Sequence, residues 1–476
     1  MTVEEDQMRK PKYIQIVEYI KEKIAKGEWA IGDRIPSQRA LAKLFDVNRS
    51  TVISALDELT ADGLIEGKSG KGTVVIHNTW TLMGHTSSTN WNENIALGIH
   101  KASMETVQKI NEAESENDLI QLSKGELSPD IFPLKKMRSV VRKVSDRLEP
   151  FGYEVPKGNL QLRQAISEYL KKAGIHASPS SILVVSGALQ ALHLISIGLL
   201  QKGSTVFLEK PSYLYSLSMF QSMGMDLKGL PMDGEGLVLS SIYQPKSKNS
   251  VLYTIPTFHN PTGKLMQEKR REELIQFCVK EQLPVIEDDV YRELWIDSPP
   301  PAPLKANDHH GNILYLGSLS KSLSPGLRIG WVVGSESVID RLADLKMQSD
   351  YGSSTLSQQV AAEWLSSGLY EDHLLFVREQ LKIRRGTALG ALETYLSPYA
   401  TWEIPKGGFF IWIKIKPAFQ LRNLFQKALA KGILLNPGSI YAEQSGQSIR
   451  LSYAYASLEE INEGIFRLGE MIKNRE

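Results

Sequence analysis

The sequence predicts an α/β protein in which a small N-terminal domain precedes a large sheet domain. From Leu119 onward, strand patterns rich in Val and Ile alternate with longer amphipathic helical patterns. Such alternation is typical of a mostly parallel sheet that is covered by helices on both faces. After about Tyr370 the pattern changes to mixed strands and helices, which indicates a smaller C-terminal α+β subdomain.

Changes in composition divide the chain into three regions. Residues 1–77 are compact and punctuated by glycine and proline. Residues 78–118 are polar and irregular, so we expect a linker with room for a short helix between His100 and Ile110. Residues 119–476 form the large domain, with its subdomain at about 370–476. Its predicted strands are Ile182–Val185, Thr205–Leu208, Val251–Ile255, Pro284–Glu287, Ile313–Leu316 and Ile329–Val333.

The overall composition excludes several classes of protein. A net charge of +1 argues against a protein that coats nucleic acid or membranes through bulk charge. The single cysteine, Cys278, excludes an internal disulfide. The longest uncharged apolar run, Ser186 to Leu200, is too short to cross a bilayer, and the N-terminus has no signal pattern. We therefore expect a cytoplasmic protein without membrane contact, and we expect no metal site.

The N-terminal region has the pattern of a winged helix-turn-helix. Apolar residues from Tyr13 to Ile24 lie on one face of a helix that ends at Gly27. Ser37 is a good N-cap for a second helix, and Asn48 follows a short turn and begins a third. Two helices joined in this way fit a helix-turn-helix, whose second helix can enter the major groove of DNA. A predicted β-hairpin wing over residues 64–76 completes the module.

This segment resembles the DNA-binding domain of GntR-type regulators. The matching residues are Gly32-Asp33-Arg34-Ile35-Pro36-Ser37-Gln38-Arg39, Leu41-Ala42 and Val47-Asn48-Arg49-Ser50-Thr51-Val52. The resemblance implies DNA contacts from Arg39, Arg49, Ser50 and Thr51, and from a wing that contains Gly70 and Lys71. Residues 1–77 hold twelve Lys and Arg against twelve Asp and Glu. We therefore expect affinity to come from a dimer that presents two modules to its operator.

Polar side chains follow five of the predicted strands, at the edge where open α/β sheets bind ligands. Ser186-Gly187-Ala188 opens a helix and offers backbone N–H groups to an anion. Lys321 comes shortly after the strand that ends at Leu316 and lies among hydroxyl side chains. The other strand ends supply an aromatic ring, an amide and a carboxylate, from Tyr213, Asn260 and Asp288.

This set of groups meets the chemical demands of pyridoxal phosphate. The aldehyde of that cofactor needs a lysine, and its pyridinium nitrogen needs a carboxylate. Its phosphate needs amides, hydroxyls and a cation. Two adjacent carboxylates are available, and the spacing to Tyr291 favours Asp288 over Asp289.

Residues 119–470 resemble the fold-type I aminotransferases through Asn260-Pro261-Thr262-Gly263, Asp288 with Tyr291, Ser318-x-Ser320-Lys321 with Arg328, and Ile449-Arg450-Leu451. The resemblance implies that Lys321 forms the internal aldimine and that Asp288 pairs with the pyridinium. Arg450 would bind a ligand carboxylate, although an ordinary ion pair is the alternative for this residue. Further cofactor contacts are implied for Ala188, Leu189, Gln190, Tyr213, Asn260, Tyr291, Ser318, Ser320 and Arg328, and for Tyr153 across a dimer interface.

The two modules together resemble the MocR/GabR-type regulators over nearly the whole chain. That resemblance implies a head-to-tail homodimer that binds operator DNA and pyridoxal phosphate, and that senses an amino acid, another amine or the cofactor itself through an aldimine at Lys321. The alternative is an active aminotransferase that carries a DNA-binding module, because every residue that transamination needs is present. The effector, the target genes and the sign of regulation stay open.

Overall fold

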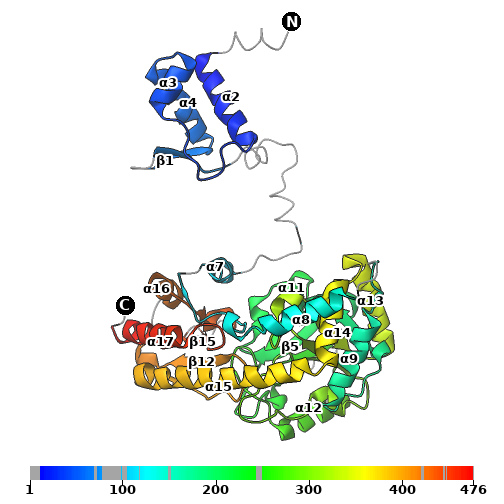
Figure 1. The fold of residues 1–476 in the computed structure, drawn as a ribbon. Helices are drawn as coiled ribbons and strands as arrows, with labels where there is room; N and C mark the ends of the chain where they lie inside the picture. The colour runs from blue at the N-terminus through cyan, green and yellow to red at the C-terminus, as the bar shows by residue number, and fades with distance from the viewer. Residues whose placement is uncertain are drawn as a thin grey trace. The chain divides into compact units, whose positions relative to one another are not determined.

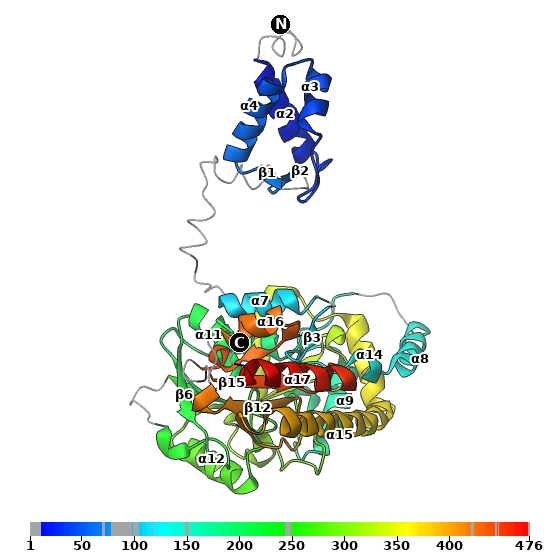
Figure 2. The same ribbon diagram turned by 90° about the vertical axis from the view of Figure 1, so that its left-hand side faces the viewer.

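The computed structural model describes residues 11–68, 72–77, 98, 104–116, 118–147, 152–242, 249–419, 423–442, 445 and 447–474. The chain divides into two compact units, Met1–Gly98 and Ile99–Glu476. Figures 1 and 2 show the elements of each unit. None of the described helices is long and apolar enough to cross a membrane.

The N-terminal unit is the predicted winged helix-turn-helix. Ser37 caps the second helix as expected, because its Oγ accepts a hydrogen bond of 3.3 Å from the backbone N–H of Ala40. Asp46 ends that helix in a left-handed conformation with φ of 50°, which turns the chain toward the third helix. The elements are α2 (Lys12–Ala25), α3 (Gln38–Phe45), α4 (Arg49–Ala61) and the antiparallel strands β1 (Ile65–Lys68) and β2 (Gly72–Val75).

Apolar side chains from all three helices and both strands form the core of this unit. Ile20, Leu41, Val52 and Leu59 are fully buried, and the hairpin adds Ile65 and Val75. These positions carry the helical spacing from which the sequence predicts one apolar face on each helix. Packing of the hairpin against α4 fixes the orientation of the wing relative to that helix.

A seven-stranded, mostly parallel sheet forms the centre of the second unit, as the sequence predicts. Its order is β4-β10-β9-β8-β7-β5-β6, and only β10 is antiparallel to its neighbours in that sheet. The edge strand β6 was not predicted, because its half-exposed sequence DLKGLP lacks a Val/Ile run. The strands are β4 (Ile182–Val185), β5 (Thr205–Lys210), β6 (Asp226–Pro231), β7 (Ser250–Thr254), β8 (Val285–Asp288), β9 (Ile313–Ser318) and β10 (Gly330–Val333).

Helices cover both faces of this sheet (Figure 1). Leu183 and Val185 of β4 pack toward α10 and α13, whereas Ile182 and Val184 pack toward α9 and α14. Burial on both faces explains the continuous apolar strands in the sequence. The helices of this layer are α8 (Leu134–Ser145), α9 (Leu160–Lys171), α10 (Ala188–Gly198), α11 (Met219–Ser222), α12 (Glu268–Lys280), α13 (Glu336–Asp350) and α14 (Thr355–Ser366).

The C-terminal subdomain is built on a second sheet, of order β11-β12-β15-β14. A long helix, α15, packs beside α17, and both cover this sheet (Figures 1 and 2). A separate parallel pair joins β13 to β3, so the start of the large domain is also paired with the subdomain. The elements are β3 (Ile120–Gln121), α15 (Leu369–Leu396), β11 (Ala400–Trp402), β12 (Phe410–Ile415), α16 (Leu424–Ala430), β13 (Ile433–Leu434), β14 (Asn436–Pro437), β15 (Ser448–Ser452) and α17 (Leu458–Lys473).

One helix, α7 (Glu105–Ala113), lies in the stretch that the sequence assigns to the linker. It belongs to the second unit, because Ile110 and Ala113 are buried against Trp412, Phe425 and other residues of the subdomain. The side chain of Gln121 holds its C-terminal end, donating to the carbonyl oxygens of Ala113 and Glu116. The polar flanks of the helix hide this short apolar face in the sequence.

Leu59→Ala is expected to lower the free energy of unfolding of the N-terminal unit by about 2–5 kcal/mol. Leu59 is fully buried, whereas Ile53 on the same helix is 39% exposed. Ile53→Ala is the matched control and should cost less than about 1 kcal/mol. Hydrogen exchange measures both effects, and residues 104–474 should keep their protection. Equal losses for the two variants would contradict this assignment of the core.

Candidate functional site

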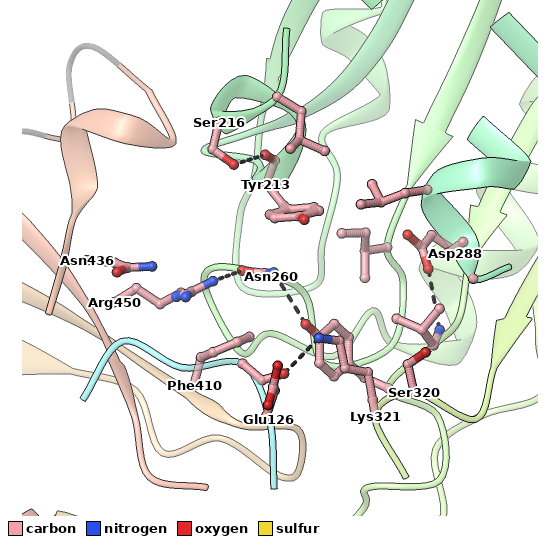
Figure 3. Close-up of a pocket in the computed structure, with 18 of the residues that line it drawn as sticks. Glu126, Tyr213, Ser216, Asn260, Asp288, Ser320, Lys321, Phe410, Asn436 and Arg450 are labelled. Carbon is pink, nitrogen blue, oxygen red and sulfur yellow. Dashed lines mark hydrogen bonds between the residues drawn. The ribbon is translucent and has the colours of Figure 1, made fainter. Parts of the chain in front are cut away.

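A cavity of about 450 Å³ lies at the carboxyl ends of the large-sheet strands (Figure 3). This size is within the range of roughly 300–1,000 Å³ that cofactor and ligand sites occupy. Walls from α7, β12 and β15 close it on the side of the subdomain. The sequence-predicted residues that line it are Ala188, Leu189, Tyr213, Asn260, Asp288, Tyr291, Ser318, Ser320, Lys321, Arg328 and Arg450.

Lys321 lies in the loop after β9 and lines the cavity. The Nζ donates a hydrogen bond of 2.7 Å to the carbonyl oxygen of Gly125. Burial lowers the pKa of this amine and Arg450 lowers it further, while Glu126 and Asp288 act in the opposite direction. A lowered pKa increases the fraction of neutral amine, which is the nucleophilic form.

Asp288 lies at the end of β8 and is almost completely buried. The hydroxyl of Tyr253 donates to its Oδ2 at 2.7 Å, and the backbone N–H of Val290 donates to its Oδ1 at 3.4 Å. Burial nevertheless raises the pKa of Asp288 to about 6. A cation in the cavity would stabilise the ionised carboxylate, as a protonated ring nitrogen does.

Asn260 connects the two halves of the cavity through its side-chain amide. Its Nδ2 donates to the hydroxyl of Tyr291 at 3.3 Å, and its Oδ1 accepts from Nη1 of Arg450 at 3.0 Å (Figure 3). The backbone N–H of Tyr213 donates to the Asn260 carbonyl at 3.2 Å, which places that aromatic ring at the cavity wall. Burial raises the pKa of Tyr213 to about 12, so its hydroxyl stays neutral.

Arg450 extends from β15 and is buried against two aromatic rings. Its guanidinium carbon lies 4.1 Å from the ring centre of Phe410, and its Nη2 donates to the carbonyl oxygen of Ser123 at 2.7 Å. Its Nε is buried without a hydrogen-bond partner. Among the described residues no carboxylate lies within ion-pair distance of Arg450, so the alternative of an ordinary ion pair is not observed. A ligand carboxylate could satisfy this charge.

The loop between β4 and α10, here called the cradle, has the geometry of an anion-binding loop. Gly187 has φ of 98°, and a Cβ at this position would lie only 2.8 Å from Nη2 of Arg328. The same Nη2 donates to the Ser186 carbonyl at 2.6 Å, which holds the guanidinium beside the start of α10. Without a side chain at Gly187, a ligand can approach the backbone closely beside the N-terminus of α10 and the Arg328 guanidinium. This combination is suited to a phosphate.

Two predicted cofactor contacts are not among the cavity-lining residues. The Oε1 of Gln190 accepts from the Ser186 backbone N–H at 2.7 Å, and its Nε2 donates to Asp350 at 2.6 Å. Its side chain therefore supports the cradle instead of facing the cavity. Tyr153 is 85% exposed, and its ring lies 5.1 Å from that of Tyr351.

The predicted DNA-contacting side chains of the N-terminal unit lie on α3 and at the start of α4. Arg39, Arg49 and Ser50 are exposed, and Thr51 is half-buried. The Nε of Arg49 donates to the side chain of Gln38 at 2.9 Å, which orients the guanidinium. Gly70 and Lys71 of the predicted wing lie outside the described residues.

Several cavity-lining residues escaped the sequence analysis. Glu114 lies on the α7 segment that was assigned to the linker. Its helix presents positions i, i+3, i+4 and i+7 to the cavity, a spacing that could have revealed this face. The others follow no motif in the sequence: Glu126, Ser216, Phe410, Asn436 and Tyr441.

Comparisons with known proteins agree with both units. The model of the aminotransferase class I and II family matches residues 117–468, and that of the gntR family of bacterial regulatory proteins matches residues 12–75. The chain is 63% identical over 473 residues to the uncharacterized HTH-type transcriptional regulator YdfD of Bacillus subtilis, covering 99% of this chain and 98% of that protein. It is 35% identical to the HTH-type transcriptional regulator NorG of Staphylococcus aureus, covering 92% of this chain and 99% of that protein.

Solved aminotransferase structures share the fold of the second unit. Kynurenine aminotransferase of Pyrococcus horikoshii, solved with PMP, matches with a TM-score of 0.74 and 32% identity, covering 79% of this chain and 96% of that chain. The α-aminoadipate aminotransferase LysN of Thermus thermophilus, solved with N-(5'-phosphopyridoxyl)-L-leucine, matches with a TM-score of 0.73 and 28% identity, covering 81% and 99%.

Asp288→Asn is expected to stabilise the ligand-free protein above about pH 6, where wild-type Asp288 is ionised. The folded-state pKa lies above the ordinary value of 3.8, so stability is lost as the pH rises from about 4 to about 6. The variant should be more stable by about 1–3 kcal/mol at pH 8 and should gain nothing at pH 4. Urea unfolding at a series of pH values measures this difference. A pH-independent difference would contradict the assigned cause.

Proposed function

We propose, from the premise that this chain belongs to the aminotransferase class I and II family and carries a GntR-type domain, that it is a DNA-binding transcriptional regulator. Its second unit would bind pyridoxal phosphate and sense a small amine or amino acid. The observation that carries the proposal is one cavity that holds the buried amine of Lys321 and the guanidinium of Arg450, which has no ion-pair partner among the described residues, in a chain that also holds a winged helix-turn-helix. The regulator names of the relatives, which match over nearly the whole chain, support it.

The residues of the cavity fit pyridoxal phosphate in charge and in donor type. The Gly187 cradle with Arg328 suits a dianionic phosphate, since a side chain at position 187 would fill the space beside the guanidinium. Asp288 is a buried carboxylate that needs a cation, and a pyridinium nitrogen provides one. Asn260 and Tyr291 supply an amide and a hydroxyl at which a ring hydroxyl can bind. Ser318 and Ser320 add hydroxyls near the phosphate cradle.

When bound, pyridoxal phosphate supplies an aldehyde carbon at which one primary amine can replace another without an oxidant or a reductant. Lys321 would present the amine of the protein to that carbon, and burial lowers the pKa of this amine, which increases the fraction in the neutral form that reacts. Arg450 would bind the carboxylate of an incoming amino acid through its fork of donors. The Asp288 carboxylate would accept a hydrogen bond from the protonated ring nitrogen and so keep that nitrogen protonated.

Ligand binding would alter DNA binding through a conformational change in the second unit. Arg450 on β15 and Lys321 after β9 belong to the subdomain and to the large sheet, so a ligand held by both favours one arrangement of these two parts. A ligand can shift this equilibrium only by its differential affinity for the two arrangements. We propose that the favoured arrangement changes how two DNA modules of a homodimer are presented to an operator.

A head-to-tail homodimer is part of the proposal. The exposed rings of Tyr153 and Tyr351 lie 5.1 Å apart, and Val155 and Leu356 are also exposed. A second copy would cover these apolar side chains. In that arrangement Tyr153 of one subunit would approach the phosphate of the other. Binding to operator DNA also implies a cytoplasmic location.

Lys321→Ala, once confirmed to be folded and dimeric, is expected to lose the effector-dependent change in DNA binding. The variant lacks the amine that an effector replaces, but the DNA-contacting residues are untouched, so binding to operator DNA without effector should persist. Fluorescence anisotropy with labelled operator measures both quantities. Normal effector-dependent binding by this variant would refute the proposed sensing chemistry.

Two further measurements separate the sensor from its alternatives. Wild-type protein mixed with an amino acid and a keto acid should show a lasting shift in cofactor absorbance without product. Rapid multiple turnover would instead favour an active aminotransferase. Operator binding that depends on the cofactor alone, compared between apo and holo protein, would favour a sensor of pyridoxal phosphate.

Arg49→Ala is expected to weaken operator binding by about tenfold, since loss of one base or phosphate contact costs roughly 1–3 kcal/mol. Cofactor absorbance should not change, because Arg49 lies in the other compact unit. Lys473→Ala on α17 removes the same charge from the second unit and is the matched control. A larger effect of the control than of Arg49→Ala would contradict the assignment of α4 as the recognition helix.

A further inference from the structure

The α7 helix forms one wall of the proposed sensing cavity and carries a carboxylate into it. Val107, Ile110, Asn111 and Glu114 line the cavity, and these positions fall on a single face of the helix. Ile110 is fixed in the apolar cluster with Trp412, so this face is held in place. Glu114 is the residue that ends the helix.

The position of Glu114 disfavours the ionised form of its carboxyl group, so a purely structural role does not explain this residue. It is partly buried, and burial raises the pKa of its carboxyl group, with Ser123 and Arg450 acting in the opposite direction. It also lies at the negative end of the helix dipole, where an acidic side chain is disfavoured. Its Oε1 accepts a hydrogen bond of 3.2 Å from the Ser123 hydroxyl, and no cation pairs with it among the described residues. A cationic ligand group would relieve both penalties.

Two other acceptors line the same cavity. Glu126 lies beside Lys321 and Phe410 (Figure 3), and its side chain is exposed rather than paired with a cation among the described residues. Asn436 is 5% exposed, and its Oδ1 is buried without a hydrogen-bond partner. Its Nδ2 donates to the hydroxyl of Tyr441 at 2.8 Å, which leaves the oxygen for a donor from a ligand. The cavity lining therefore holds two carboxylates and an amide oxygen that have no cation paired with them among the described residues.

The charges of the cavity indicate which ligand it suits. Its lining holds three cations, Lys321, Arg328 and Arg450, and three anions, Glu114, Glu126 and Asp288. The cofactor would pair its phosphate with Arg328 and its ring nitrogen with Asp288, and the Lys321 amine that the effector releases lies beside the exposed Glu126 (Figure 3). An amino acid with one amine and one carboxylate would then neutralise Arg450 and leave the partly buried Glu114 without a paired cation. A second ammonium group would compensate Glu114.

We propose that the effector of this chain is a diamino acid, whose distal ammonium binds Glu114 with help from Glu126 and Asn436. This inference rests on the proposed function, because it assigns the first amine of the ligand to the cofactor and its carboxylate to Arg450. The inference adds the Glu114 carboxylate as a ligand-binding group, a role that neither the sequence motifs nor the comparisons assign. The choice of effector would then depend on α7, a helix within the predicted linker.

The test compares L-lysine with L-norleucine, which has the same carbon chain without the distal ammonium. Full-length protein loaded with pyridoxal phosphate is titrated with each, and binding is followed by cofactor absorbance and by the shift in Tm. L-Lysine is expected to bind about tenfold or more tightly than L-norleucine, since one partly buried ion pair contributes about 1.4 kcal/mol or more. L-Glutamate, with a distal carboxylate, should bind most weakly.

Glu114→Gln should remove most of this preference while leaving or improving the binding of L-norleucine. The variant keeps the acceptor for Ser123 and should fold normally. Glu112→Gln is the matched control, because Glu112 is exposed on the same helix and lies outside the cavity lining. Glu126→Gln, at the more exposed carboxylate, should reduce the preference by a smaller factor.

The outcomes separate the two proposals. Equal binding of L-lysine and L-norleucine to the wild-type protein would overturn the inference and leave the proposed function intact. Equal weakening of both ligands by Glu114→Gln would also overturn it, since that result indicates a structural role. If no primary amine shifts the cofactor absorbance, the proposed function fails, and the inference fails with it.

Discussion

Burial of charge without a protein counter-charge is the constraint on which the second unit depends. Lys321, Asp288 and Arg450 are all withdrawn from water, yet their hydrogen-bond partners are neutral groups: a carbonyl oxygen for Lys321, the hydroxyl of Tyr253 for Asp288, and an amide and a carbonyl for Arg450. An uncompensated charge in such a place is destabilising. Apolar cores on both faces of the sheet stabilise the fold against this cost. The proposed ligand would supply the missing partners.

The sheet brings these charges together through its topology. The parallel strands β7, β8 and β9 end at the same edge, so residues separated by tens of positions in sequence meet there. The antiparallel strand β10 pairs with both β9 and β4, which places the cradle loop after β4 on the other side of Lys321. Arg450 reaches the same point from a different sheet. The site therefore needs both sheets of the second unit.

Sequence reasoning predicted the strands and the residues at their ends because both signals are local. Val/Ile-rich runs mark buried strands, and polar residues after them fall at the ligand-binding edge. It did not find the role of α7, since the apolar face of that helix is short and surrounded by polar residues. Glu126 and Asn436 gave no local signal, because their place in the cavity depends on how the subdomain packs. Gln190 shows the reverse: it follows the motif but turns to Asp350 instead of the cavity.

That contact of Gln190 has a thermodynamic consequence. One carboxylate oxygen of Asp350 accepts from Gln190, and the other accepts from the backbone N–H of Gly352 at 2.9 Å. Tyr351 lies between Asp350 and Gly352 in the sequence; its side chain is exposed and its backbone is in a left-handed conformation. A second copy that covers Tyr351, as proposed above, would therefore also restrain the backbone amide of Ser186 in the loop after β4. If an anion bound at that loop alters association at Tyr351, linkage requires association to alter anion binding by the same factor.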